Sequence, residues 1–286
     1  MFFKELYHYR YLMREIVAKN IKIQYRHSVL GMFWTLLQPL LTTLVLVFVF
    51  GYVFGRNADA NTVRNFPIYL LCGRLLYEFY SQSTKRAMRS VTGSASVLKK
   101  VKVPKYIYPL SNVISTFITF LISMLVLVGF TVFFFLAKDP KNPPPRITLY
   151  ILFSPVPLLI LFLLCTGVGL ILSTLSVFFK DVENLYDVFC LLLFYATPIF
   201  YTPDKLGDSK ALQMALKANP LYSIVEMFRD CVLRGGCLLE RGGSLVYPGW
   251  PFNPNHLLYS LGFALGVLLI GGLVFWRKQD KFILHI

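Results

Sequence analysis

Residues 19–55 decide the fold, and they read KNIKIQYRHSVLGMFWTLLQPLLTTLVLVFVFGYVFG. The stretch begins as a basic, aromatic segment and then continues between His27 and Arg56 without a charge. An α-helix needs roughly 20 apolar residues to cross the hydrocarbon core of a bilayer, so this run is long enough to span it. Lys22 and Tyr25 are side chains of the kinds that settle at a headgroup layer. The stretch therefore predicts a membrane helix whose basic end faces the cytoplasm.

The composition of the whole chain is that of an integral membrane protein. Of the 286 residues, 56% are hydrophobic and 15% are charged. Soluble domains have roughly 45–50% apolar and 25% charged residues. The net charge of +15 comes from lysines and arginines that lie between apolar runs. Because cytoplasmic loops of membrane proteins collect such residues, the charge does not indicate a nucleic-acid partner.

The order of apolar and polar segments predicts an all-α integral membrane fold with six transmembrane helices. The expected spans are about 30–54, 66–84, 107–137, 147–179, 185–201 and 257–276. Two further elements are expected, an amphipathic interface helix over 1–28 and short external re-entrant helices over 206–235. With both termini cytoplasmic, 17 Lys and Arg residues lie inside and 11 outside. This excess of cations on the inner side agrees with the positive-inside rule.

Two pairs of residues leave alternatives open. Arg74 and Glu78 are four residues apart in the second span, so they share a helix face and can pair. Charges at membrane depth are costly, and this pair either stabilises the bundle or lines a substrate path. Cys231 and Cys237 flank a short Arg-Gly-Gly segment. Their spacing allows a disulfide on an oxidising side of the membrane but does not require one.

Motifs for chemistry are absent. The chain has no G-x-x-x-x-G-K-[ST], no G-x-S-x-G and no H-E-x-x-H, and no Cys/His spacing typical of a metal site. It also has too few acidic residues in its spans for a proton-coupled transporter. We therefore expect a transporter subunit that is not an enzyme, binds no cofactor or metal, and takes its energy from a partner ATPase.

Several landmarks follow one another along almost the whole chain. They are Tyr25-Arg26-His27-Ser28-Val29-Leu30-Gly31 with Trp34 and Pro39, Lys102-Val103-Pro104-Lys105, Phe179-Lys180-Asp181-Val182, Ala196-Thr197-Pro198-Ile199-Phe200-Tyr201, and Asn219-Pro220 with Phe228-Arg229. In this order they resemble the membrane subunit of a type-two ABC exporter. The resemblance is to the branch that exports lipid-linked polysaccharides, namely O-antigen, capsule and wall teichoic acid.

The resemblance implies an architecture and partners. It implies one transmembrane domain over residues 1–286, as a homodimer in the bacterial plasma (inner) membrane with two ABC ATPase subunits that carry ATP and Mg. Residues 93–104 correspond to the coupling helix that docks on the ATPase. The coupling residues are Val97, Leu98, Lys99, Lys100 and Val101. The interface helix borders the place where substrate enters, residues 206–235 cap the exit, and the substrate lipid is undecaprenyl diphosphate.

The candidate substrate-path residues follow from this reading. Arg and Lys suit a diphosphate headgroup, and aromatic rings suit sugars. The candidates are Lys22, Tyr25, Arg26, His27, Phe33, Trp34, Arg74, Glu78, Tyr195, Phe200 and Tyr201. For the rings the alternative is a position facing lipid or in an interfacial belt.

Other functions are weighed against this one. One is an ABC exporter of a drug, a peptide or a small lipid, which a neighbouring gene for glycan synthesis would argue against. Another is a membrane enzyme acting on a polyprenyl lipid, which needs clustered acids or histidines that the sequence lacks. A third is a channel, which needs no ATPase. The polymer itself is not predicted, because both an anionic and a neutral glycan fit.

Overall fold

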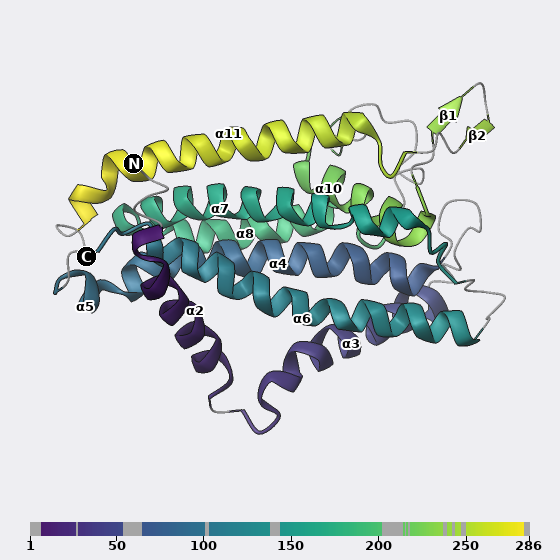
Figure 1. The fold of residues 1–286 in the computed structure, drawn as a ribbon, viewed down its shortest axis with the longest axis horizontal. Coiled ribbons are helices and arrows are strands. Elements are labelled where there is room, and N and C mark those ends of the chain that lie inside the picture. The colour runs from purple at the N-terminus through teal and green to yellow at the C-terminus, as the bar shows by residue number, and fades with distance from the viewer. Residues whose placement is uncertain are drawn as a thin grey trace.

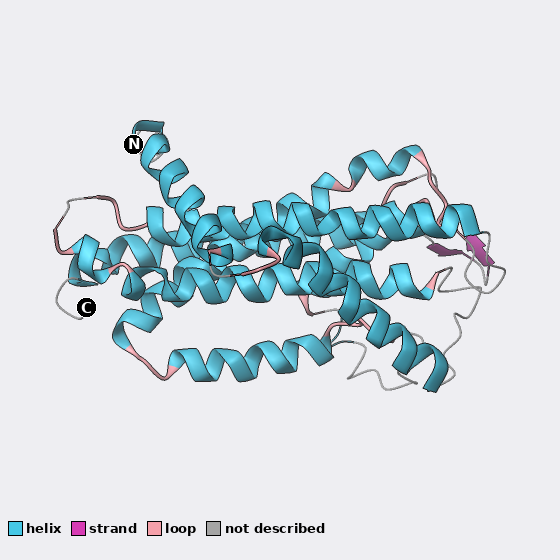
Figure 2. Ribbon diagram, turned by 90° about the horizontal axis from the view of Figure 1, so that it is seen from below, coloured by secondary structure: helices cyan, strands magenta, loops and turns pink. Residues whose placement is uncertain are grey.

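The computed structural model is an elongated helical bundle with a single pair of short strands among the residues that it describes (Figures 1 and 2). The described residues are 7–26, 28–53, 65–100, 103–137, 144–201, 214, 216, 218–236, 239–241, 244–246 and 250–282. The first described helix begins at the same end of the bundle as the C-terminal turn (Figure 1). The strand pair lies at the opposite end.

The chain starts with two helices that diverge from the bundle as a V (Figure 1). Helix α2 spans Arg10–Tyr25, and the 3-10 turn η1 (Gly31–Phe33) leads into α3 (Trp34–Val47) and the π-helix η2 (Phe48–Val53). Gly31 has a φ of 52°, which is the left-handed conformation that glycine adopts without strain. Within the predicted first span over 30–54, residues 31–53 form one nearly continuous helical run, and residue 54 lies outside the described residues.

Helix α4 (Phe66–Gly93) is the centre of the bundle. Asn65 caps its start by accepting a hydrogen bond from the Ile68 N–H, and Pro67 occupies the first turn, where its missing N–H is harmless. From Ile68 to Cys72 every side chain is fully buried. A helix that is apolar on all sides is a buried one, and α4 packs against both α6 (Ile107–Ala137) and α7 (Pro155–Phe178).

Helix α11 (Pro254–Lys278) runs along α7 and ends in the 3-10 turn η6 (Gln279–Lys281). Gly167 makes this close packing feasible, because a Cβ added there would lie 2.6 Å from the backbone nitrogen of Leu268. The start of α7 also follows the sequence. The 3-10 turn η3 (Leu149–Phe153) comes first, and the regular helix begins at Pro155, where the prolines predict a break.

Helix α8 (Val182–Ala196) ends at Thr197-Pro198. The segment that follows, which the sequence predicts to be external and which is called the external segment below, contains α10 (Pro220–Arg229) and the π-helix η5 (Asp230–Arg234). The strands β1 (Leu239–Arg241) and β2 (Ser244–Val246) pair antiparallel. This pair of three-residue strands is not predicted by the sequence, and the all-α fold class is confirmed by the helices that form the rest of the bundle. Most of the first expected re-entrant helix lies outside the described residues.

Three expectations are modified by the structure. Within the described ranges, four helices are long and apolar enough to cross a membrane: Gly31–Phe50, Ile107–Ala137, Leu149–Phe178 and Pro254–Lys281. Helix α4 carries charges at Arg74 and Glu78, and α8 has only 15 residues, so these two do not meet the same standard. Helix α4 continues through the basic segment to Gly93, and the described part of the helix expected over 93–104, which excludes residues 101–102, contains the one-turn α5 (Ala95–Leu98).

Candidate functional site

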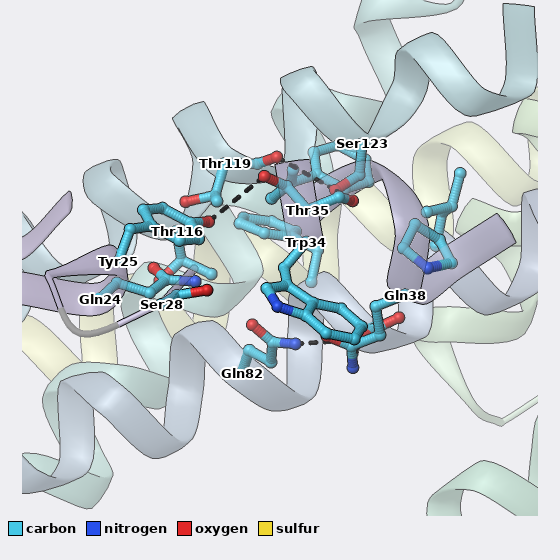
Figure 3. A pocket seen from close by; sticks show the side chains of 15 residues that line it. Gln24, Tyr25, Ser28, Trp34, Thr35, Gln38, Gln82, Thr116, Thr119 and Ser123 are labelled. Atoms are coloured by element: carbon cyan, nitrogen blue, oxygen red, sulfur yellow. Dashed lines mark hydrogen bonds between the residues drawn. The ribbon is translucent and has the colours of Figure 1, made fainter. Parts of the chain in front are cut away.

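A polar cavity of about 240 Å³ lies where the V of α2 and α3 meets the bundle. Helix α2 and the turn after it, α3, α4 and α6 all contribute to its wall (Figure 3). The wall consists of Gln24, Tyr25, Ser28, Trp34, Thr35, Gln38, Pro39, Leu75, Glu78, Phe79, Gln82, Thr116, Thr119, Phe120 and Ser123. Carboxamides, hydroxyls and one carboxylate thus face one another inside a protein that is otherwise rich in apolar residues.

Glu78 is the centre of the hydrogen bonds in this wall. Its Oε1 accepts hydrogen bonds from Gln38 Nε2 at 3.2 Å and from Gln82 Nε2 at 3.0 Å. Its Oε2 lies 3.9 Å from Arg74 Nε, which is an ion-pair distance but too long for a hydrogen bond. Arg74 Nε is buried and has no hydrogen-bond partner among the described residues. The Glu78 carboxylate therefore links α3 to α4 through Oε1, and its Oε2 can still accept a hydrogen bond.

The turn between α2 and α3 is tied to the wall by hydroxyl groups. Tyr25 donates to Thr35 Oγ1 at 3.5 Å, and Thr35 Oγ1 donates to the Met32 carbonyl. Ser123 on α6 donates to the Thr35 carbonyl at 3.1 Å. The Ser28 hydroxyl accepts from the Gly31 N–H at 3.1 Å. These bonds hold Trp34 at the mouth, where its indole is 44% exposed beside Gln38 and Gln82 (Figure 3).

Helix α2 packs along α6, with most of its contacting side chains only half-buried. Val17 is its one buried residue. Asn20 Nδ2 donates to Asn112 Oδ1 at 3.4 Å, and Arg86 Nη1 donates to Gln24 Oε1 at 2.9 Å. Burial lowers the pKa of Arg86, and the nearby Tyr25 partly offsets this effect. An amphipathic helix that is held by one buried apolar residue and by hydrogen bonds of amide side chains is a loosely fixed wall of the cavity.

The structure brings some of the predicted substrate-path residues together and separates others. Tyr25, Trp34 and Glu78 line the cavity, and Arg74 contacts Glu78. Three are outside the wall, since Lys22 and Arg26 are exposed on or just after α2 and Phe33 is exposed on η1. His27 lies outside the described residues.

The other three predicted aromatic residues lie at the end of α8, away from this cavity. Phe200 is buried and stacks on Phe50 with ring centroids 5.2 Å apart, so its ring is part of the packed core. Tyr195 is 63% exposed on α8. The hydroxyl of Tyr201 donates to the Tyr195 carbonyl at 2.9 Å.

The polar residues of α3, α4 and α6 were missed at the sequence level. Thr116, Thr119 and Ser123 are spaced i, i+3 and i+7, which places them on one face of an otherwise apolar helix. Gln82 follows Glu78 by four residues, which puts both on one face of α4. The spacing was a usable signal, but only the fold shows that these two faces meet.

A second polar site, an ion cluster of four residues, is buried at the external segment. Its members are Glu226, Arg229, Asp230 and Arg234. Arg229 is fully buried, donates to the Pro198 carbonyl at 2.8 Å and to the Tyr69 carbonyl at 3.2 Å, and lies 3.4 Å from the centroid of the Tyr69 ring. The cluster thus fastens α10 to α4 and to the break after α8.

The charges in this ion cluster affect its acids in opposite ways. Burial raises the pKa of Glu226, but Arg234 at 2.7 Å and Arg229 at 3.0 Å lower it more strongly, to about 2. Burial raises the pKa of Asp230 to about 7, although Arg234 at 2.8 Å opposes the effect. Burial lowers the pKa of Arg234, but its two carboxylate partners outweigh this and raise it. The sequence analysis named Arg229 only as a landmark.

Cys231 is a free, buried thiol in this region, and burial raises its pKa to about 12. Its Sγ lies 3.8 Å from the Pro251 carbonyl oxygen. The expected disulfide partner, Cys237, lies outside the described residues. No group of three or more His, Cys, Asp or Glu side chains in the described ranges could hold a metal ion.

The short helix α5 presents a mixed surface. Val97 is 43% exposed, and Lys99 and Lys100 are exposed too, whereas Leu98 is buried. Val101 lies outside the described residues. Leu98 belongs to a core that the C-terminal turn completes, made of Val91, Leu98, Tyr108, Val177, Phe275 and Phe282.

Lys105 connects this core to the C-terminal turn. Its Nζ donates to the Gln279 carbonyl and lies 5.8 Å from the centroid of the Phe282 ring. Burial lowers the pKa of Lys105, and Asp280 partly offsets the effect. The chain end therefore packs beneath the one-turn helix α5.

The family model described as ABC-2 type transporter matches residues 11–233. This chain therefore belongs to the ABC-2 type transporter family, and it is the membrane subunit of a transporter, not an enzyme.

Among its relatives is an O-antigen export system permease protein RfbA from Myxococcus xanthus, which is 30% identical over 79% of this chain and 82% of its own length. A permease of the same name from Klebsiella pneumoniae is 27% identical over 83% and 86%. The polysialic acid transport protein KpsM from Escherichia coli is 23% identical over 93% and 92%.

Proposed function

We propose that this chain is the permease subunit of an ATP-driven exporter of a lipid-linked polysaccharide. The observation that carries the proposal is its similarity, over most of both chains, to permeases named for O-antigen export and polysialic acid transport. Undecaprenyl diphosphate is the lipid carrier that we propose, and O-antigen, capsule and wall teichoic acid are the polymer classes. The exposed Lys22 and Arg26 suit the diphosphate by charge.

The proposed topology has six spans and both termini in the cytoplasm of a bacterial cell. Four helices support it by length and composition. Helix α4 is the fifth, because its 28 residues extend about 42 Å at 1.5 Å per residue and its charged pair faces the cavity side. Helix α8 is the sixth, and its 15 residues reach the break at Pro198, beside which α10 lies. We propose that α10 and η5 form part of an external cap.

The energy source that we propose is two ABC ATPase subunits bound to a homodimer of this chain. The sequence has no Walker-type motif, so ATP and Mg belong to the partner. Helix α5 is the proposed docking element, because Val97, Lys99 and Lys100 are exposed while Leu98 anchors the turn from beneath. The whole chain would act as one transmembrane domain.

The test has two parts. Depletion of this chain in its host should remove polymer from the cell surface, and normal surface polymer would overturn the substrate assignment. Co-purification with the candidate ATPase should give ATP hydrolysis, which Val97→Ala with Lys99→Ala should reduce. The matched control is Lys180→Ala, which removes an exposed lysine from the turn before α8. If no ATPase co-purifies and the chain transports alone, the exporter assignment fails.

A further inference from the structure

We propose that the cavity between α2, α3, α4 and α6 binds one uncharged glycosyl ring and disfavours anionic sugars, with Glu78 as the residue that discriminates. This inference rests on the proposed function, since it names the part of the exported molecule that this wall recognises. It differs from the expected diphosphate site, because the exposed Lys22 and Arg26 do not line the cavity.

The size of the cavity sets the first limit. Pockets for drug-sized ligands measure roughly 300–1,000 Å³, and this cavity measures about 240 Å³. It therefore accommodates a single ring and not a stretch of polymer. Its opening beside the exposed Trp34 leaves the rest of a chain outside (Figure 3).

The wall offers hydrogen bonds of both kinds that sugar hydroxyls need. Thr116 and Thr119 donate their hydroxyl protons to helix carbonyls of α6 at 2.8 and 2.6 Å, and Ser123 donates to the Thr35 carbonyl at 3.1 Å, which leaves the three hydroxyl oxygens as acceptors. Each carboxamide of Gln38 and Gln82 uses one N–H on Glu78 and has a second to donate. A hydroxyl both donates and accepts, so a polyhydroxylated ring matches this set.

Aromatic rings complete the wall. Trp34, Phe79 and Phe120 line the same cavity as the amides and hydroxyls. Aromatic faces pack against the apolar C–H face of a sugar ring, while its hydroxyls require polar partners. An acyl chain would instead leave the polar groups of this wall buried without partners, which is costly. The wall therefore fits a sugar better than a lipid tail.

Charge decides between neutral and anionic sugars. Among the described residues that line the wall there is no lysine, arginine or histidine, and Glu78 is the one acidic residue. Arg74 is the nearest cation to it, and its guanidinium already faces the Glu78 carboxylate. Two like charges about 4 Å apart in a partly buried site repel with up to about 4 kcal/mol, so a carboxylate on the ligand would weaken binding.

The experiment compares hexyl β-glucoside with hexyl β-glucuronide, which differ by one carboxylate, and uses hexanol as the tail alone. The full chain is held in lipid nanodiscs free of glycoside detergent, with Trp250→Phe and Trp276→Phe so that Trp34 reports. Binding is read from Trp34 fluorescence and, independently, from saturation-transfer NMR of the ligand. We expect the glucoside to bind at least about tenfold more tightly than the glucuronide, and hexanol not to compete.

Two variants locate the effect. Glu78→Gln should reduce the preference for the glucoside to within about twofold, and Gln82→Leu should weaken glucoside binding roughly five- to tenfold. The matched controls are Glu183→Gln, which removes a carboxylate paired with Arg89, and Gln279→Leu at the C-terminal turn. Neither control should change binding.

Each outcome is decisive. Equal binding of both glycosides, competition by hexanol, or a full preference in Glu78→Gln overturns the inference. If Glu78→Gln does not assemble, Gln38→Leu is used in its place. Unchanged glucoside binding in both Gln38→Leu and Gln82→Leu would then overturn the inference. Surface polymer after depletion of the chain tests the proposed function separately. Normal polymer export without glycoside binding would overturn the cavity assignment and leave the exporter standing.

Discussion

Arg229 is expected to be the most costly side chain to remove from the external segment. Its guanidinium is fully buried and donates to carbonyls of Pro198 at 2.8 Å and Tyr69 at 3.2 Å. It also pairs with Glu226 at 3.0 Å. The variant Arg229→Met retains much of the volume but removes the charge and every donor. These bonds connect α10 to α4 and to the end of α8, so the variant separates three elements at once.

The magnitude follows from the partners that remain. Breaking a buried ion pair by removing one member costs about 3–5 kcal/mol. Glu226 keeps Arg234 at 2.7 Å, so the lower part of that range applies. In a chain of this size, about 3 kcal/mol lowers the Tm by roughly 10 °C. Arg229→Lys, which keeps the charge but loses the planar fork, should lie between the wild type and Arg229→Met.

The assay is thermal unfolding of the purified chain in nanodiscs, followed by tryptophan fluorescence. The control is Arg277→Met, which removes an exposed arginine from the last turn of α11. The reasoning is refuted if Arg229→Met lowers the Tm no more than Arg277→Met does. It is also refuted if the lysine variant is as damaging as the methionine variant, because the charge would then contribute nothing.

Three further predictions concern the external segment and the C-terminal turn. Gly73→Ala should cost about 1–3 kcal/mol, because its Cβ would lie 2.7 Å from Arg229 Nη2. The pKa of Asp230 is raised to about 7 from 3.8, so its contribution to stability is complete below pH 3.8 and is lost progressively as the pH rises to about 7, and the Tm should fall between about pH 4 and 7 and level off above that. Phe282→Ala should reduce ATPase turnover of the complex and cost about 3–5 kcal/mol, because the fully buried Phe282 packs beneath α5.

Each of these has a control in the same chain. Gly129→Ala adds a Cβ in open space and should leave the Tm unchanged. Asp230→Asn should remove the fall in Tm between about pH 4 and 7, and a fall that persists would assign it to another group. Phe263→Ala truncates a ring that is 41% exposed on α11. If Phe263→Ala reduces ATPase turnover as much as Phe282→Ala does, the C-terminal turn has no special role.

The sequence was sufficient for the features that depend on local pattern. Apolar runs located four long helices. The sequence was insufficient to predict how long helices α4 and α5 are. Helix α4 continues past its apolar half because no helix-breaking residue lies between that half and Gly93. Helix α5 begins at Ala95, directly after this break, and is one turn long.

The parts of the sites that were not predicted depend on contacts between distant segments. Arg229 meets Tyr69 across 160 residues, and Gln38 meets Glu78 across 40. Asp230 therefore had no distinguishing signal within the predicted re-entrant helices over 206–235, although the fold buries it. The paired strands β1 and β2 are three residues each, too short for an alternating pattern to show.

The two polar sites, the ion cluster and the cavity, differ in how firmly they hold their helices. At the external end, buried ion pairs of 2.7–3.0 Å connect α10 and η5 within a core that excludes water. At the cavity, α2 is held by one buried valine and by side-chain hydrogen bonds of 2.9–3.5 Å. Elements with few buried apolar contacts open at the lowest free-energy cost. Movement that admits a substrate is therefore expected at the V of α2 and α3, while the external segment keeps its shape.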